Sequence, residues 1–287
     1  MIDLHTHSSA SDGDLEPAQL VEKAACLGLS ALALTDHDTI SGLSEAKKAA
    51  QALGIRLISG VELEIQTGNP EGAGILPVIN GEFHLLGLGI DKPSPALTAA
   101  LERLAGARDR RNREMVERIR AAGIDAEYGA VKAFAGGGIV GRPHFGAFLI
   151  SRRVVKSQEQ AFKRWLGKGR PFYVPKEGLE FEKAAGLIHD SGGIAVLAHP
   201  MSLYVAWGRL PGLFAVLRER GLDGMEAWHP TAKPKACKRL EELGRGLGLC
   251  ITAGSDFHGS ARPDRKLGYT AGDRQIEDRF LEGIPPG

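Results

Sequence analysis

The histidines of this chain stand where several of them could bind metal ions together. His5 and His7 form an H-x-H pair after the first short apolar run, and Asp256 and His258 form a D-x-H pair after the last one. Because side chains alternate along a strand, both members of such a pair lie on one face, close enough to share an ion. Imidazole nitrogen combined with carboxylate oxygen suits zinc, manganese or iron(II).

The same residue types recur near the ends of the other predicted strands. Functional residues of parallel β/α barrels gather at the carboxyl ends of the strands, so we expect these side chains to meet. The predicted ligands are His5, His7, Asp12, His37, Glu62, His84, His199, Asp256 and His258. Nine ligands exceed the need of one ion, and we predict two or three ions, with Glu62 bridging two of them.

Short strand patterns alternate with helical patterns along most of the chain. The strand candidates are Ile2–His5, Ala31–Thr35, Arg56–Val61, Phe83–Leu88, Ile194–Ala198, Gly224–Trp228 and Cys250–Ala253. The helix candidates between them are Pro17–Leu27, Ser44–Leu53, Leu179–His189 and Ala232–Leu247. This alternation favours parallel strands with helices outside. Seven strands are too many for a small open sheet, so we predict an α/β fold with a closed or nearly closed barrel.

The alternation breaks between about residues 94 and 175, where the pattern is helical. We predict a metal-binding barrel from residues 1–94 and 176–287, with 95–175 as a helical insertion. Its first predicted helix carries Arg103, Arg108, Arg110, Arg111, Arg113, Arg118 and Arg120. Arginine suits phosphate because its planar fork donates two hydrogen bonds at once. The same arginines also fit a solvated helix with i, i+4 ion pairs such as Glu114–Arg118.

Composition limits the partners and the location. The formal net charge of +1 gives no bulk attraction to nucleic acid or an anionic membrane. Cys26, Cys237 and Cys250 are scattered and form no C-x-x-C pair, which indicates a reducing compartment. We see neither a signal peptide nor an apolar run of membrane-spanning length. We therefore expect a cytoplasmic protein.

The motifs DLHTHSSASDG, ALTDHD, GVE, HLLGLGI, AHP and GSDFH resemble those of the polymerase and histidinol phosphatase (PHP) family, in order and spacing along nearly the whole chain. The resemblance implies a distorted (β/α)7 barrel with metals at the strand ends. It implies one ion at His5, His7, Glu62 and Asp256, a second at Glu62, His84 and His199, and a third at Asp12, His37 and His258. Relatives often have histidine at the position of Asp12, which here keeps an oxygen ligand.

Water is the nucleophile that such a centre implies. A bound metal lowers the pKa of its water toward about 7, and we predict Asp12 and His37 beside this metal-bound water as catalytic residues. Asp36 and Ser255 flank ligands, and we expect them either to orient those ligands or to cap loops. His229 precedes Ala232, which stands where relatives carry a histidine. His229 could substitute for that histidine or lie at the surface, and we favour the surface.

The helical insertion also looks like the one in PHP phosphoesterases that cleave nucleoside 3′,5′-bisphosphates or short RNA. Arg108 and Arg111 match an R-x-x-R pair of those enzymes, Arg142 and His144 match the segment GRPHF, and Arg170 matches GKGRPFYV. The resemblance implies that these five side chains bind substrate and that the insertion covers the active site.

We therefore predict a metal-dependent phosphoesterase that hydrolyses the 3′-phosphate of a nucleoside 3′,5′-bisphosphate, with manganese as the first choice and zinc or iron as alternatives. A 5′–3′ exoribonuclease acting on short RNA would use the same centre, although the low net charge disfavours long nucleic acid. Histidinol phosphate is a third possible substrate, but the arginines would repel its amine. A non-catalytic PHP scaffold, as in DNA polymerases, is the alternative of another class, and metal content would distinguish it.

Overall fold

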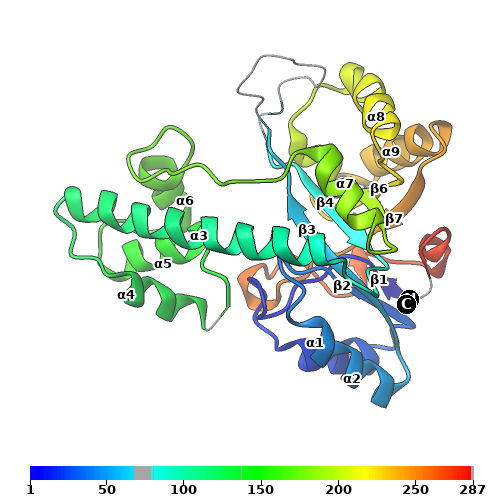
Figure 1. The fold of residues 1–287 in the computed structure, drawn as a ribbon, viewed down its shortest axis with the longest axis horizontal. Coiled ribbons are helices and arrows are strands. Elements are labelled where there is room, and N and C mark those ends of the chain that lie inside the picture. The colour runs from blue at the N-terminus through cyan, green and yellow to red at the C-terminus, as the bar shows by residue number, and fades with distance from the viewer. Residues whose placement is uncertain (68–78, 80, 137, 286–287) are drawn as a thin grey trace. The chain divides into compact units, whose positions relative to one another are not determined.

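A computed structural model describes residues 1–67, 79, 81–136 and 138–285. The chain divides into two compact units (Figure 1). Unit 1 contains Met1–Ala99 and Gly178–Gly287, and unit 2 contains Ala100–Glu177. No helix among the described residues is both long enough and apolar enough to cross a membrane.

Unit 1 is built on a seven-stranded sheet in which the strands lie in chain order. The strands are β1 (Ile2–Asp3), β2 (Ala31–Leu34), β3 (Arg56–Glu64), β4 (His84–Leu88), β5 (Ile194–Leu197), β6 (Gly224–Trp228) and β7 (Cys250–Ala253). Beyond the ends of β1 and β7 the backbones also pair, because Leu4 donates to Ala253 at 3.3 Å and Asp256 donates to His5 at 2.9 Å. The sheet is therefore a nearly closed barrel, and the predicted α/β barrel is confirmed. A separate small sheet pairs β8 (Tyr269–Thr270) with β9 (Arg274–Gln275).

One strand runs against the predicted direction. β4 is antiparallel to both β3 and β5, whereas the other neighbouring pairs are parallel, so the prediction of parallel strands is wrong for β4. A parallel neighbour needs a long crossover, usually a helix. No helix occurs among the described residues between β3 and β4, which are 65–67, 79 and 81–83. The register pairs Glu64 with His84, so the start of β4 lies beside the end of β3.

Helices of unit 1 cover the outside of the barrel. They are α1 (Pro17–Cys26), α2 (Leu43–Leu53), α7 (Phe181–His189), α8 (Leu210–Glu219) and α9 (Pro234–Gly246). α1 and α2 lie together on one side, and α7, α8 and α9 lie on another (Figure 1). In α1, Leu20, Val21 and Ala24 recur at helical spacing and are fully buried against the barrel. α2 ends at Gly54, whose φ of 67° is in the left-handed region that glycine adopts without strain.

Unit 2 is helical and has its own core. Its elements are α3 (Pro95–Ala121), which starts in unit 1, α4 (Tyr128–Lys132), α5 (Arg142–Ser151), α6 (Gln158–Ala161) and a π-helical turn at Phe162–Leu166. Met115 and Ile119 of α3 pack in one cluster with Phe145 and Phe148 of α5 and with Phe172. On the outer face of α3, Glu114 and Arg118 form the predicted i, i+4 ion pair at 2.7 Å.

Candidate metal centre

A single buried carboxylate lies at the centre of the histidine cluster. Glu62 belongs to β3 and its side chain is 1% exposed. One oxygen, Oε1, lies 2.9 Å from His84 Nδ1 and 3.0 Å from His199 Nε2. The other, Oε2, lies 3.1, 3.2 and 3.3 Å from ring nitrogens of His37, His7 and His5, respectively. The two oxygens thus face different groups of imidazoles, which is the arrangement a bridging ligand needs.

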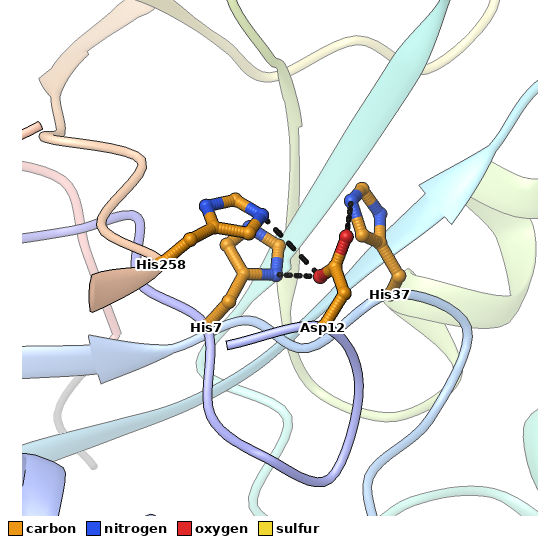
Figure 2. Close-up of side chains that lie close together, drawn as sticks. All are labelled: His7, Asp12, His37 and His258. Carbon is orange, nitrogen blue, oxygen red and sulfur yellow. Dashed lines mark ion pairs between the residues drawn. The ribbon is translucent and has the colours of Figure 1, made fainter. Parts of the chain in front are cut away.

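A second carboxylate, Asp12, lies in the loop after β1 and faces three imidazoles (Figure 2). Its Oδ1 is 3.3 Å from His258 Nε2 and 3.8 Å from His7 Nδ1, and its Oδ2 is 3.9 Å from His37 Nε2. The rings of His7 and His258 stack with centroids 4.1 Å apart. Most of these separations are too long for hydrogen bonds, but they suit ligand atoms that share an ion about 2 Å from each of them.

The remaining predicted ligands complete the cluster. Asp256 Oδ1 lies 3.3 Å from His7 Nε2 and 3.6 Å from His5 Nε2. His84 Nδ1 lies 3.2 Å from His199 Nε2. All nine predicted ligands therefore meet at one end of the barrel. His84 does so from the start of its strand because β4 is reversed.

Three buried atoms of this cluster have no hydrogen-bond partner among the described residues. They are His7 Nδ1, Glu62 Oε2 and His258 Nε2. Nε2 of His5 and Nε2 of His7 face each other at 3.1 Å. Buried polar atoms are nearly always satisfied, and two facing ring nitrogens require a proton or a cation between them. The donor set therefore fits divalent metal ions.

Two of the predicted ligands have a backbone conformation that is costly to form. His199 has a φ of 29° and Asp256 a φ of 52°, although neither is glycine. Residues held in this region cost about 1–3 kcal/mol each and persist only where the surroundings over-determine them. The strain thus coincides with two strand ends that turn their side chains toward the cluster.

Two further carboxylates contact predicted ligands, and the sequence patterns did not reveal them. Glu226 of β6 lies 3.1 Å from His5 Nδ1 and accepts from the backbone of His199 at 2.7 Å. Glu64 lies 2.9 Å from His84 Nε2. Such outer partners fix the orientation and tautomer of metal-binding histidines. A lone glutamate within the apolar strand GMEAW was the signal that could have identified Glu226.

The side chain of Asp36 accepts hydrogen bonds from the loop that follows β1. Its carboxylate accepts from the backbone of Ser8 at 2.8 Å, from the Ser8 hydroxyl at 2.7 Å and from the Ser11 hydroxyl at 2.5 Å. These bonds hold the segment that carries Asp12. Of the two roles that the sequence left open for Asp36, the structure favours loop capping.

His229 is buried beside the cluster, so the expectation that it is a surface residue is wrong. Its side chain is 3% exposed, and Nε2 lies 3.3 Å from Asp256 Oδ2 and 3.0 Å from Arg265 Nη1. It directly follows β6, whose carboxyl end opens toward the cluster as those of its parallel neighbours do. Arg265 is also buried and was not identified from the sequence, because it follows the last strand by a dozen residues and belongs to no ligand pattern.

Charges in the cluster shift the pKa values of its members. Burial disfavours the protonated form of His7, but Asp256 and Glu62 outweigh burial and raise the pKa of His7 to about 9. Burial likewise disfavours protonation of His5, yet Glu226 and Glu62 raise its pKa well above 6.5. For Glu62, burial favours the neutral acid, but the surrounding imidazoles hold its pKa well below 4.5. Without metal, protons therefore occupy imidazoles that an ion would need.

This competition predicts how metal affinity changes with pH. Metal binds neutral imidazole, so each ion must displace protons, and apparent affinity should rise with pH through neutrality toward the pKa of His7, about 9. Calorimetric titration of the metal-free protein with Mn²⁺ at pH 7, in buffers of different ionisation enthalpy, should show net proton release. A titration heat that is the same in every buffer would contradict this assignment.

The predicted substrate-binding residues lie in unit 2 in different surroundings. Arg111 is buried, and its Nε and Nη2 donate to Asn112 Oδ1 at 3.2 and 2.7 Å. The Arg142 guanidinium lies over the rings of Tyr173 and Phe162, 5.6 and 6.0 Å from their centroids. His144 Nδ1 accepts from the backbone of Gly141 at 2.9 Å, at the start of α5.

Arg108 is half-buried on α3, and Arg170 is exposed. Arg170 lines a cavity of about 560 Å³ with Ser157, Glu159, Gln160, Lys163 and Arg164. Within the described part of the chain, none of the other four predicted substrate residues lines that cavity. The five side chains thus do not form one site around it.

Known proteins resemble this chain over most of its length. The PHP domain model matches residues 3–129. A 5′-3′ exoribonuclease of Haemophilus influenzae is 38% identical over 89% of this chain and 89% of its own length. A 3′,5′-nucleoside bisphosphate phosphatase of Chromobacterium violaceum is 33% identical over 94% of this chain and 91% of its own.

A solved structure resembles this one closely. It is an amidohydrolase from Chromobacterium violaceum with bound sulfate, superposes with a TM-score of 0.82, and is 31% identical over 97% of this chain and 92% of that one. A putative metal-dependent phosphoesterase from Bifidobacterium adolescentis superposes with a TM-score of 0.80 and is 27% identical over 99% of this chain and 94% of that one. This chain belongs to the PHP family and is a metal-dependent phosphoesterase.

Proposed function

We propose that this enzyme hydrolyses the 3′-phosphate of nucleoside 3′,5′-bisphosphates. The observation that carries the chemistry is Glu62, one buried carboxylate whose two oxygens face five imidazoles. The substrate class rests on the Chromobacterium violaceum relative, whose named substrate is of this kind. The three cysteines are free thiols, which fits the reducing cytoplasm as the proposed location.

The nine ligands are proposed to hold two to three divalent ions, with manganese as the first choice. Ions held there would supply water of lowered pKa and neutralise the charge on the phosphoryl oxygens. Asp12 and His37 are 28% and 21% exposed, whereas Glu62 and His7 are almost fully covered. Asp12 and His37 are therefore the proposed catalytic residues, because their side chains are the part of the cluster that solvent and substrate reach and would hold and orient the attacking water.

The second phosphate of a bisphosphate needs its own binding groups, because the cluster engages only the phosphoryl group that is cleaved. We propose that unit 2 supplies them through Arg108, Arg111, Arg142, His144 and Arg170. Charge-assisted hydrogen bonds from arginine to phosphate contribute about 1.5–3 kcal/mol each. Binding of this kind requires the insertion to cover the active site, as its resemblance to PHP insertions implies.

Steady-state kinetics on a matched pair of substrates test this function. With Mn²⁺ present, we expect efficient release of phosphate from a nucleoside 3′,5′-bisphosphate and a kcat/KM about ten- to a hundredfold lower for the 3′-monophosphate, which lacks the remote group. Arg142→Ala should lower kcat/KM for the bisphosphate roughly ten- to a hundredfold, affect the 3′-monophosphate far less and leave metal content unchanged. Equal losses on both substrates would mean that Arg142 does not bind the remote phosphate.

A 5′–3′ exoribonuclease on short RNA is the second candidate, favoured by the Haemophilus influenzae relative at 38% identity. A 5′-phosphorylated oligoribonucleotide of a few residues would be degraded stepwise to 5′-mononucleotides. If its kcat/KM exceeds that of the bisphosphate, the exonuclease is the better assignment, and the bisphosphate would then be only the shortest substrate of the same site.

A further inference from the structure

The carboxylate of Asp256 faces two different environments. Its Oδ1 points toward the cluster, 3.3 Å from His7 Nε2 and 3.4 Å from His258 Nδ1. Its Oδ2 lies 2.8 Å from Arg265 Nη1 and 3.3 Å from His229 Nε2. Arg265 and His229 are 6% and 3% exposed, so their contacts with Asp256 Oδ2 are as buried as the cluster itself.

Arg265 stands between two acceptors. Arginine only donates hydrogen bonds, so the contact from Arg265 Nη1 to His229 Nε2 at 3.0 Å requires a lone pair on that nitrogen. On the other side of the ring, His229 Nδ1 lies 2.7 Å from Thr231 Oγ1 and 3.3 Å from the backbone N–H of Thr231. His229 Nε2 and Asp256 Oδ2 lie 3.3 Å apart, and the guanidinium contacts both of them, which is where a cation shared by an imidazole and a carboxylate would lie.

His229 and Asp256 also belong to a candidate metal site with His5. His5, His229 and Asp256 are buried, and each offers a ligand atom within 4.8 Å of the others. Two imidazoles and a carboxylate are a ligand set that suits a transition metal. The guanidinium of Arg265 contacts two of the three.

We propose that Arg265 is a built-in cation that takes the place of a further metal ion at the His5–His229–Asp256 group. The guanidinium neutralises Asp256 permanently and engages its Oδ2, which leaves Oδ1 to serve the cluster. It also engages the ring nitrogen of His229 that would otherwise bind metal. Arg265 thereby limits the number of ions to those held by the other ligands. This proposal rests on metal binding by the cluster but not on the identity of the substrate.

Metal counting tests the proposal without an activity assay. Arg265→Met keeps a long apolar side chain in the buried position but removes the charge. After saturation with Mn²⁺ or Zn²⁺ and removal of excess ions, we expect elemental analysis to find one ion per chain more than in the wild type. Adding His229→Ala should return the count to the wild-type value. An Arg265→Met count equal to or below that of the wild type would overturn the proposal.

Two further variants keep the test decisive if Arg265→Met does not fold. His229→Ala in the otherwise native protein should leave the ion count unchanged, because Arg265 already occupies its ring nitrogen. Loss of an ion in that variant would show that His229 is itself a ligand, and the proposal would fail.

Arg262→Met is the matched control, since Arg262 is in the same loop, 3.6 Å from Asp256 Oδ2, but its side chain is 42% exposed. Its ion count should equal that of the wild type, and an extra ion there would show that loss of nearby charge alone is sufficient.

Discussion

Glu62→Gln is expected to lower kcat/KM on the order of a thousandfold and to reduce the bound metal. The amide keeps the shape of the side chain but removes the charge that faces imidazoles of His5, His7, His37, His84 and His199. The metals supply both the nucleophile and the charge stabilisation of a phosphoryl transition state. A loss of about 4 kcal/mol in that stabilisation corresponds to roughly a thousandfold in rate. Kinetics at saturating Mn²⁺, with elemental analysis of the same samples, measure both effects.

Glu64→Gln is the matched control for this substitution. Glu64 is two residues along β3, and its Oε2 lies 2.9 Å from His84 Nε2, on the outer side of that ring. Loss of such an outer partner typically costs 10- to 100-fold in metal affinity or activity. We therefore expect Glu64→Gln to retain at least tenfold more activity than Glu62→Gln. Mild and equal losses would show that Glu62 does not bridge two ions.

The convergence of the candidate ligands could be predicted from the sequence because they follow a positional rule. His7, Glu62 and His199 come just after or at the end of strands whose apolar patterns are clear, and parallel strands bring such ends together. His84 also reaches the cluster, but from the start of its strand, because β4 is antiparallel to its neighbours. The sequence pattern does not show this direction. A strand of five residues reads alike in both directions, so only the register with β3 shows that its first residue faces the cluster.

The residues that support the ligands were harder to predict. Glu226 and His229 lie at the end of β6 in an order that matches no ligand pair, and Arg265 lies in a loop whose path only the folded chain defines. Their roles depend on contacts between residues up to 221 positions apart in the sequence, such as that from Glu226 to His5. Local periodicity reports which face of a strand is buried, but it does not report which groups meet across a barrel.

Substitution of His7 is expected to remove more metal than substitution of His84. His7 belongs to two candidate ligand groups, one with Asp12, His37 and His258 and one with His5 and Glu62, whereas His84 belongs to one. His7→Ala should therefore lower the count by about two ions per chain and kcat/KM by roughly a thousandfold or more, since both the nucleophile and the charge stabilisation depend on metal. His84→Ala should lower the count by about one ion.

His189→Ala provides the control for loss of a histidine as such. His189 is 39% exposed at the end of α7 and pairs with Asp223 at 2.7 Å, so its removal should change neither metal content nor kcat/KM. Elemental analysis of His7→Ala, His84→Ala and His189→Ala beside the wild type measures how many ions each variant loses. If His7→Ala and His84→Ala each lose a single ion, His7 serves one ion only, and the Asp12 group must then hold its metal through His37 and His258 without it. The stacked ring of His7 would in that case pack against His258 rather than link two ions.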